Sequence, residues 1–195
     1  IACSLEKKDA CINNPPPLEV SSEWSGWGGN IYNNRWALDK SPIDPLSSGL
    51  LTQRCRLPCH LGVSATPTVK DDVVYYPTWD GQLIALNYKT CEVQWTISVV
   101  DIITQFAPLT NVQRQVLHLV SRSSPQIDGT TLYFTTLVHA LLVAIDRNTG
   151  AVLGTTQINP HPLAQLTMSP TVYHGRIFIG ASGYEEVAAN TVPNY

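Results

Sequence analysis

The sequence predicts an all-β fold, a β-propeller of four-stranded antiparallel blades, and three observations support this expectation. In three places a proline precedes an aromatic residue by eight positions: Pro67 before Tyr75, Pro125 before Tyr133 and Pro170 before Phe178. Each interval holds a polar turn followed by an alternating apolar run, and the prolines lie 58 and 45 residues apart. Repeats of this length with strand-type alternation are typical of propellers, because a single blade cannot bury both of its faces.

The composition agrees with a compact globular protein. The chain has 195 residues, of which 44% are hydrophobic and 14% charged, and its net charge of -3 comes with no basic run. We therefore expect no nucleic-acid partner. The longest apolar stretch, Leu141 to Ile145, is far shorter than the roughly 18 residues of a membrane helix, so we expect no membrane partner. The chain begins with Ile1 rather than Met, which we interpret as removal of a leader and as a sign of a secreted or periplasmic protein.

The N-terminal part of the sequence is irregular. Residues 1–20 contain the run Asn13-Asn14-Pro15-Pro16-Pro17 and predict an arm, and we expect residues 21–195 to belong to one propeller domain. The segment Trp24 to Trp36 has glycines between its aromatic residues, which is typical of a tight turn with packing side chains. Residues 37–54 predict a loop or a short helix, whose length Pro42 and Pro45 limit.

The first complete repeat runs from Ala65 to Trp95. Val73 to Tyr76 is a β-branched and aromatic run that predicts a strand, and Gln82 to Leu86 predicts its partner. Asp80-Gly81 between them supplies a tight hairpin turn.

Two segments, Ala85 to Trp95 and Ala144 to Gly154, overlay to give the pattern AxDxxTGxxxW. A small alanine allows blades to approach closely, an Asp or Asn with Thr and Gly forms a turn, and the tryptophan packs between blades. The pattern resembles the tryptophan docking motif of quinoprotein dehydrogenases, the propellers that hold pyrroloquinoline quinone. Three positions depart from it, where Asn87 replaces Asp, Cys91 replaces Gly and Gly154 replaces Trp.

Further strings resemble the polyvinyl-alcohol-dehydrogenase branch of this family. They are GVSATPTV, VYYPTWDGQL, VSRSSP, NPHP and SPTVYHGRIFIG. The segment Trp24 to Trp36 also resembles the opening of the first blade in this family. Together these segments extend the resemblance over residues 24–189. The insert between Val99 and Val120 departs from the family, and its apolar spacing predicts a short amphipathic helix on the propeller rim.

The resemblance implies an eight-bladed propeller, of which this chain would supply about four blades and end within a hairpin after Ile179. Half a propeller exposes strand edges and one apolar blade face. We therefore expect the remaining blades to come from a second polypeptide, produced by cleavage near Tyr195, or from a part of the protein outside this sequence.

The resemblance also implies a site for a small-molecule ligand in the central funnel. In the family, Arg, Thr and Ser side chains hold pyrroloquinoline quinone, Ca²⁺ polarises the quinone, and a separate Asp takes the proton of the alcohol. Carried over by position, Arg122, Thr167, Ser182 and Gly183 would contact the cofactor and Glu185 would bind calcium. The catalytic residue is not assigned in this chain.

Each of these residues also has a structural interpretation. Ser182-Gly183 suits a plain turn, Arg122 suits bonds to backbone carbonyls between blades, and Glu185 suits a solvated loop. The sequence thus leaves two functions open. One is a propeller that oxidises an alcohol or polyol with pyrroloquinoline quinone and calcium, and the other is a non-catalytic propeller that binds a small molecule or chromophore.

Five cysteines, an odd number, are present: Cys3, Cys11, Cys55, Cys59 and Cys91. We expect a local disulfide, Cys3 with Cys11 or Cys55 with Cys59, and one thiol that is free or bonded to another chain. A different interpretation of residues 55–60 is a haem c attachment site. The haem interpretation is disfavoured, because the spacing here is CxxxCH rather than CxxCH.

Overall fold

The structure is a computed structural model that describes residues 24–29, 33, 35, 49, 51–58 and 61–192. The arm predicted for residues 1–20 lies outside the described residues, as do Cys3, Cys11, Cys59 and His60 and most of the segment 37–54. Within the described residues, no helix is long and apolar enough to cross a membrane.

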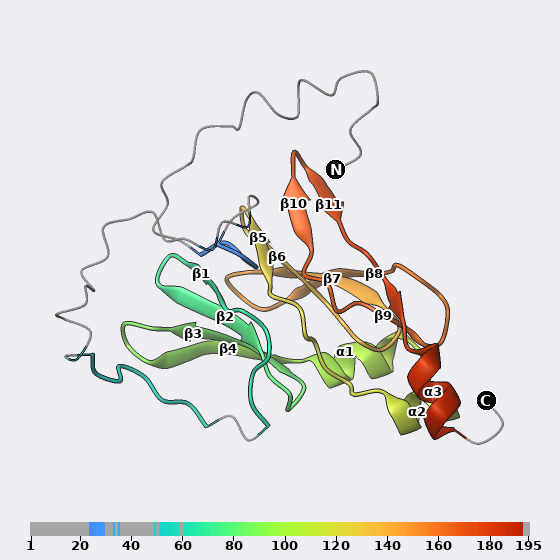
Figure 1. Cartoon of the computed structure of the whole chain (residues 1–195). Coiled ribbons are helices and arrows are strands. Elements are labelled where there is room, and N and C mark those ends of the chain that lie inside the picture. Colours follow the sequence, from blue (N-terminus) through green and yellow to red (C-terminus); the bar gives the residue numbers. More distant parts are fainter. Residues whose placement is uncertain are drawn as a thin grey trace.

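The first blade is a four-stranded antiparallel sheet (Figure 1). Its strands follow one another in chain order as β1 (Thr68–Lys70), β2 (Val73–Pro77), β3 (Gln82–Asn87) and β4 (Glu92–Ser98). Burial alternates along β2, so that Val73 and Tyr75 face the core while Val74 and Tyr76 are partly exposed. Gly81 adopts a φ of +77° in the β2–β3 turn, a backbone conformation that glycine enters without steric cost. The predicted strands and the Asp80-Gly81 turn are confirmed.

The second blade repeats this arrangement. It consists of β5 (Gln126–Asp128), β6 (Thr131–Thr135), β7 (Leu141–Asp146) and β8 (Val152–Gln157), again paired in chain order. The register shifts between Ala85 and Leu86 in the first blade and between Ala144 and Ile145 in the second. These positions are equivalent in the two repeats, so the blades share a β-bulge as well as a strand order.

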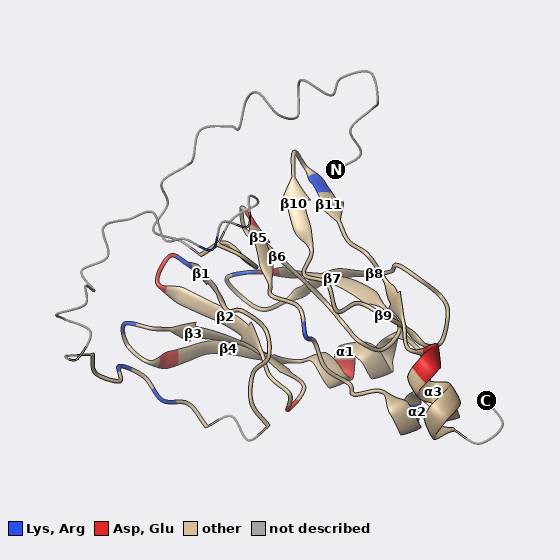
Figure 2. Ribbon diagram, in the orientation of Figure 1, with Lys and Arg blue, Asp and Glu red and all other residues tan. Residues whose placement is uncertain are grey.

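The C-terminal part contains two short sheets and a helix. β10 (Thr171–Tyr173) pairs with β11 (Arg176–Phe178) and lies beside β5, while β9 (Ala164–Gln165) pairs with β12 (Ser182–Gly183). The hairpin expected after Ile179 was a wrong prediction, because β12 and the helix α3 (Glu185–Thr191) follow instead. Two acidic residues open α3 (Figure 2), where the helix dipole favours negative charge.

The described residues therefore contain two complete blades and a two-stranded sheet at the third proline repeat. The all-β propeller class is confirmed. The segment Trp24 to Trp36, which we expected to open the first blade, is described only in part, and Trp24 pairs there with Val69 of β1.

The insert between the blades forms two helices where one was expected, α1 (Val99–Phe106) and α2 (Asn111–Val116). Pro108 lies between them and cannot continue a helix. Ser98 caps α1 by accepting a hydrogen bond from the Asp101 backbone N–H, and Thr110 forms a capping box with Gln113 at the start of α2.

Trp95 joins the two blades. Its indole Nε1–H donates a hydrogen bond of 2.9 Å to the backbone carbonyl of Arg147. The ring lies against Gly150, where an added Cβ would stand 3.0 Å from Trp95 Cδ2. A side chain at that position would collide with the indole, so the glycine of the second repeat receives the tryptophan of the first. The predicted docking motif is confirmed at this joint.

The turn before each docking position has the same construction. Asn87 and Asp146 both accept hydrogen bonds at Oδ1 from the backbone N–H groups two and three residues later, at 2.9 or 3.0 Å. An amide oxygen and a carboxylate oxygen perform the same task here. Hydrogen bonds from Thr149, first from its backbone and then from its hydroxyl, hold the pKa of Asp146 below its ordinary value.

The disulfide in the described residues joins Cys55 to Cys91 across a sequence separation of 36. The pairing of Cys55 with Cys59 was therefore a wrong prediction. Arg54 donates to the carbonyls of Tyr88 and Lys89, at 3.0 and 3.1 Å, and so holds the segment 51–58 beside the β3–β4 turn that contains Cys91. Because its sulfur is bonded to Cys91, Cys55 is not free to attach haem.

Candidate ligand-binding site

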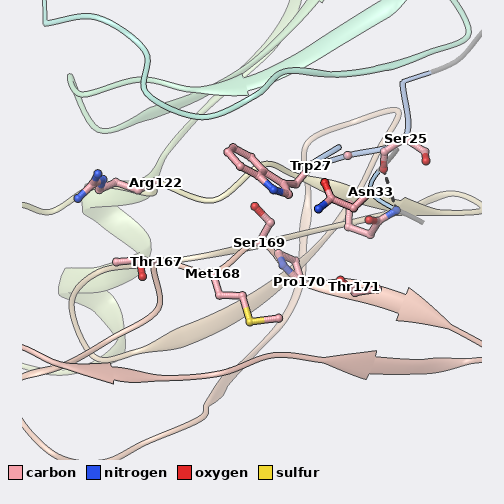
Figure 3. A pocket seen from close by; sticks show the side chains of 11 residues that line it. Ser25, Trp27, Asn33, Arg122, Thr167, Met168, Ser169, Pro170 and Thr171 are labelled. Atoms are coloured by element: carbon pink, nitrogen blue, oxygen red, sulfur yellow. Dashed lines mark hydrogen bonds between the residues drawn. The ribbon is translucent and has the colours of Figure 1, made fainter. Parts of the chain in front are cut away.

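A cavity of about 330 Å³ lies where three parts of the chain meet. Its walls come from Ser25 to Trp27 with Asn33, from Arg122 and Gln126 at the entry to the second blade, and from Thr167 to Thr171, the segment that leads into β10. In Figure 3, Arg122 and Thr167 lie toward one end of the view, and Ser25 and Asn33 toward the other. Its volume lies in the range of small-molecule sites, which begins near about 300 Å³.

Hydrogen bonds tie the walls of the cavity to the second blade. Gln126 Nε2 donates to the Ser25 carbonyl at 2.8 Å, a bond that Figure 3 shows. The backbone N–H of Ser124 donates to Ser169 Oγ at 2.8 Å. At Gly26 an added Cβ would stand 2.8 Å from Gln126 Oε1, so glycine permits the close approach of the N-terminal segment.

Arg122 supplies the positive charge of the cavity. Its side chain is exposed, and its Cζ lies over the ring of Trp79, 5.4 Å from the centroid. Among the residues that the structure describes, no carboxylate pairs with Arg122 and no backbone carbonyl accepts from it. The guanidinium therefore keeps its N–H donors for a ligand, and the alternative of bonds to carbonyls between blades is not what the described part of the chain shows.

Trp27 and the hydroxyl groups give the cavity a mixed lining. The indole of Trp27 is 52% exposed and has the Arg35 guanidinium over its ring, 5.4 Å from Cζ to the centroid, so the part of the ring that Arg35 does not cover is open to a ligand. Thr167 contributes a hydroxyl group close to the end that Arg122 occupies, and Asn33 contributes an amide. Such a set of a cation, neutral hydrogen-bonding groups and a flat apolar surface suits a planar anion.

The five predicted site residues divide into two groups. Arg122 and Thr167 line the same cavity, whereas Ser182, Gly183 and Glu185 are not among its lining residues. Ser182 and Gly183 form β12, in which Ser182 Oγ donates to the Gln165 carbonyl at 3.5 Å. They belong to a short strand rather than to the plain turn that was the alternative.

Glu185 lies at the start of α3 and pairs with a histidine. Its Oε1 is 3.2 Å from His161 Nδ1, and both side chains are about half exposed. Among the described residues, no group of three or more His, Cys, Asp or Glu side chains comes together as a metal site would require. Glu185 is therefore not joined by two further His, Cys, Asp or Glu side chains among the described residues.

The sequence did not indicate the N-terminal wall or the aromatic support of Arg122. Ser25, Trp27 and Asn33 were interpreted as parts of a turn. Trp79 was assigned only to the segment VYYPTWDGQL, which predicts a strand and a turn, and received no role in the site. The high aromatic content of the segment Trp24 to Trp36 was the available signal, but its position beside Thr167 to Thr171 depends on tertiary structure.

A family model described as "Outer membrane protein assembly factor BamB", with the short name PQQ_2, matches residues 52–194. The chain belongs to this family. The matched region includes all five predicted site residues and both complete blades, while the wall formed by Ser25, Trp27 and Asn33 precedes it.

This chain is also similar to two curated proteins named "Polyvinylalcohol dehydrogenase". That of Pseudomonas sp. is 28% identical over 183 residues, covering 92% of this chain and 27% of the relative. That of Sphingopyxis sp. (strain 113P3) is 28% identical over 193 residues, covering 92% of this chain and 26% of the relative. The chain thus spans about a quarter of the length of these relatives.

A solved structure supports the propeller fold. The "Europium-containing methanol dehydrogenase" aligns with a TM-score of 0.67 and 17% identity, over 83% of this chain and 28% of that chain. At this identity the likeness concerns the fold alone.

Proposed function

We propose that this chain forms part of a quinoprotein propeller that oxidises an alcohol or polyol, and that the cavity at Arg122 and Thr167 contacts pyrroloquinoline quinone. The observation that carries the proposal is the presence of these two residues in one cavity, beside the exposed indole of Trp27. The similarity to two polyvinylalcohol dehydrogenases over 92% of the chain supports the choice of reaction.

The lining fits this cofactor, which is a planar aromatic carboxylate with quinone oxygens. A guanidinium without an acidic partner among the described residues suits a carboxylate, because its fork can donate two hydrogen bonds at once. The Thr167 hydroxyl can donate to a further oxygen. Trp27 offers a flat surface that excludes water from one side of a planar ligand.

When bound, the cofactor supplies the two-electron oxidant that accepts hydride from an alcohol carbon. The chain's own residues bind and orient it. Arg122 would hold a carboxylate of the cofactor, and Thr167, which lies toward the same end of the cavity, would hold a further oxygen. The group that takes the alcohol proton is not assigned to the described residues.

Calcium does not enter this account. Glu185 lies beside His161, and no group of three or more His, Cys, Asp or Glu side chains comes together among the described residues, so no step is derived through a cation.

We also propose that a second polypeptide supplies the remaining blades. The outer strand β8 supports this, because it is exposed along nearly its whole length and Leu153 is 61% exposed. The Cys55–Cys91 disulfide supports a secreted or periplasmic location, since disulfides persist in oxidising compartments.

The test is a titration of the cofactor-free, full-length protein with pyrroloquinoline quinone by calorimetry, followed by assay of alcohols and polyvinyl alcohol with an artificial electron acceptor. Arg122→Gln should weaken binding about 10- to 100-fold, because a charge-assisted hydrogen bond contributes about 1.5–3 kcal/mol. Arg114→Gln is the matched control, since Arg114 is exposed on α2 and outside the cavity.

Two results would contradict the proposal. Equal binding by the wild type and Arg122→Gln would place the cofactor elsewhere. Absence of both binding and alcohol-dependent reduction of the acceptor would favour the non-catalytic propeller instead.

A further inference from the structure

Trp79 connects the first blade to the residues that approach the second blade. It lies in the β2–β3 connection, and its backbone N–H donates to the Gly62 carbonyl at 2.9 Å. Two side chains of the segment 118–122 contact its indole: Arg122 through the ring face, at 5.4 Å from Cζ to the centroid, and His118 edge-on, with centroids 5.5 Å apart at 87°. Trp79 is thus the aromatic platform on which this segment rests.

Two arginines of the first joint use their donors in protein contacts, whereas Arg122, like the exposed Arg114 and Arg176, makes no such bond among the described residues. Arg147 pairs with Asp71 at 2.7 Å, and Arg54 donates to two backbone carbonyls. In the described part of the chain Arg122 has only the contact with the Trp79 ring. A cation within about 6 Å of an aromatic centroid is attracted to the ring face, and this attraction does not use up the N–H donors.

We propose that Trp79 is a positioning residue that holds the Arg122 guanidinium at the cavity for the carboxylate of a planar anionic ligand. Trp79 is not itself a lining residue, so it acts through Arg122. A carboxylate partner from the protein would hold the arginine equally well, but it would neutralise the charge and occupy the fork. The identity of the ligand as pyrroloquinoline quinone rests on the proposed function, whereas the role of Trp79 follows from its contacts.

The experiment is a double-mutant cycle on the full-length protein, with pyrroloquinoline quinone binding measured by calorimetry. Trp79→Leu should weaken binding about 3- to 10-fold, the range expected for losing one cation–π contact. Trp79→Phe keeps a ring face and should recover part of the affinity. In the Arg122→Gln background, Trp79→Leu should cause no further loss, because the residue that Trp79 positions is already absent.

Separate controls test whether the variants remain folded and whether the result depends on the choice of ligand. Urea midpoints of all variants identify any general loss of structure, and the absence of a further loss in the Arg122→Gln background distinguishes positioning of Arg122 from a packing defect. Unchanged affinity of Trp79→Leu, or an equal loss in the Arg122→Gln background, would overturn the proposal.

A wild type that does not bind pyrroloquinoline quinone would refute the proposed function but not yet the role of Trp79. Trimesate, a planar aromatic polycarboxylate, is then the probe, and binding with the same dependence on Trp79 and Arg122 would support the inference. Binding of neither compound would overturn it.

Discussion

Gly150→Ala tests whether the two blades are joined as the structure indicates. Gly150 has a φ of +75°, and an added Cβ would stand 3.0 Å from Trp95 Cδ2 and 3.2 Å from Ile97 Cγ2. A non-glycine residue in the left-handed region costs roughly 1–2 kcal/mol. Forcing a methyl group into a packed contact costs typically about 1–3 kcal/mol more. We expect the substitution to lower the free energy of unfolding by about 2–5 kcal/mol.

Gly129→Ala is the matched control for the backbone cost. Gly129 has a φ of +58° in the β5–β6 turn, and no atom of the described residues lies within 4 Å of an added Cβ. It should therefore cost only the roughly 1–2 kcal/mol of the left-handed backbone. The difference between the two variants isolates the contact with Trp95.

The measurement is equilibrium unfolding of the full-length protein in urea. Both variants are compared with the wild type using the same dependence of the free energy of unfolding on urea concentration. Equal destabilisation by Gly150→Ala and Gly129→Ala would refute the reasoning, because it would mean that the Trp95 ring does not rest on Gly150.

Two further predictions concern the turn regions. Replacing Cys55 and Cys91 by serine should lower the free energy of unfolding by up to about 4 kcal/mol, since the disulfide closes a loop with a sequence separation of 36. Dithiothreitol should destabilise the wild type more than the variant, and an equal effect on both would contradict this. Asp146→Asn should preserve the turn, as Asn87 does in the first blade, but alter the pH dependence of stability. The lowered pKa of Asp146 gives stability that is present above its ordinary pKa of 3.8 and is lost as the pH falls through the pKa of the folded state. In the variant, the urea midpoint of unfolding should therefore fall less steeply than in the wild type as the pH is lowered. The same pH dependence in both proteins would argue against this prediction.

Features that depend on neighbouring residues were predictable from the sequence. The alternation at Val73 to Tyr76 and the Asp80-Gly81 turn concern residues a few positions apart, and the structure has both where they were expected. The docking motif was predictable for a related reason, because each copy is a local turn that recurs. Arg122 and Thr167 came from a resemblance, and they do lie in one cavity.

Features that depend on tertiary contacts were not predictable in this way. A cysteine four residues from Cys55 was the favoured partner by proximity, yet the structure brings Cys91 to it from the β3–β4 turn. The segment Ser25 to Trp27 lies beside Thr167 to Thr171, and no local pattern indicates a contact between residues so distant in sequence. The contact between Trp79 and Arg122 depends in the same way on how two blades meet.

The departures from the docking motif follow from what each copy of it faces. A blade's tryptophan packs on the glycine of the next blade, as Trp95 does on Gly150, so a copy needs a glycine only where a tryptophan arrives. At the first copy the segment 51–58 arrives instead, and Cys91 takes the glycine position with a φ of +63° and bonds to Cys55. The first joint is therefore covalent where the second is packed. At the second copy Gly154 replaces the tryptophan, and no described atom lies within 4 Å of its added Cβ, so within the described residues no third turn receives a side chain from it. The substitution by Cys91 thus reflects the neighbour at its joint rather than decay of the repeat.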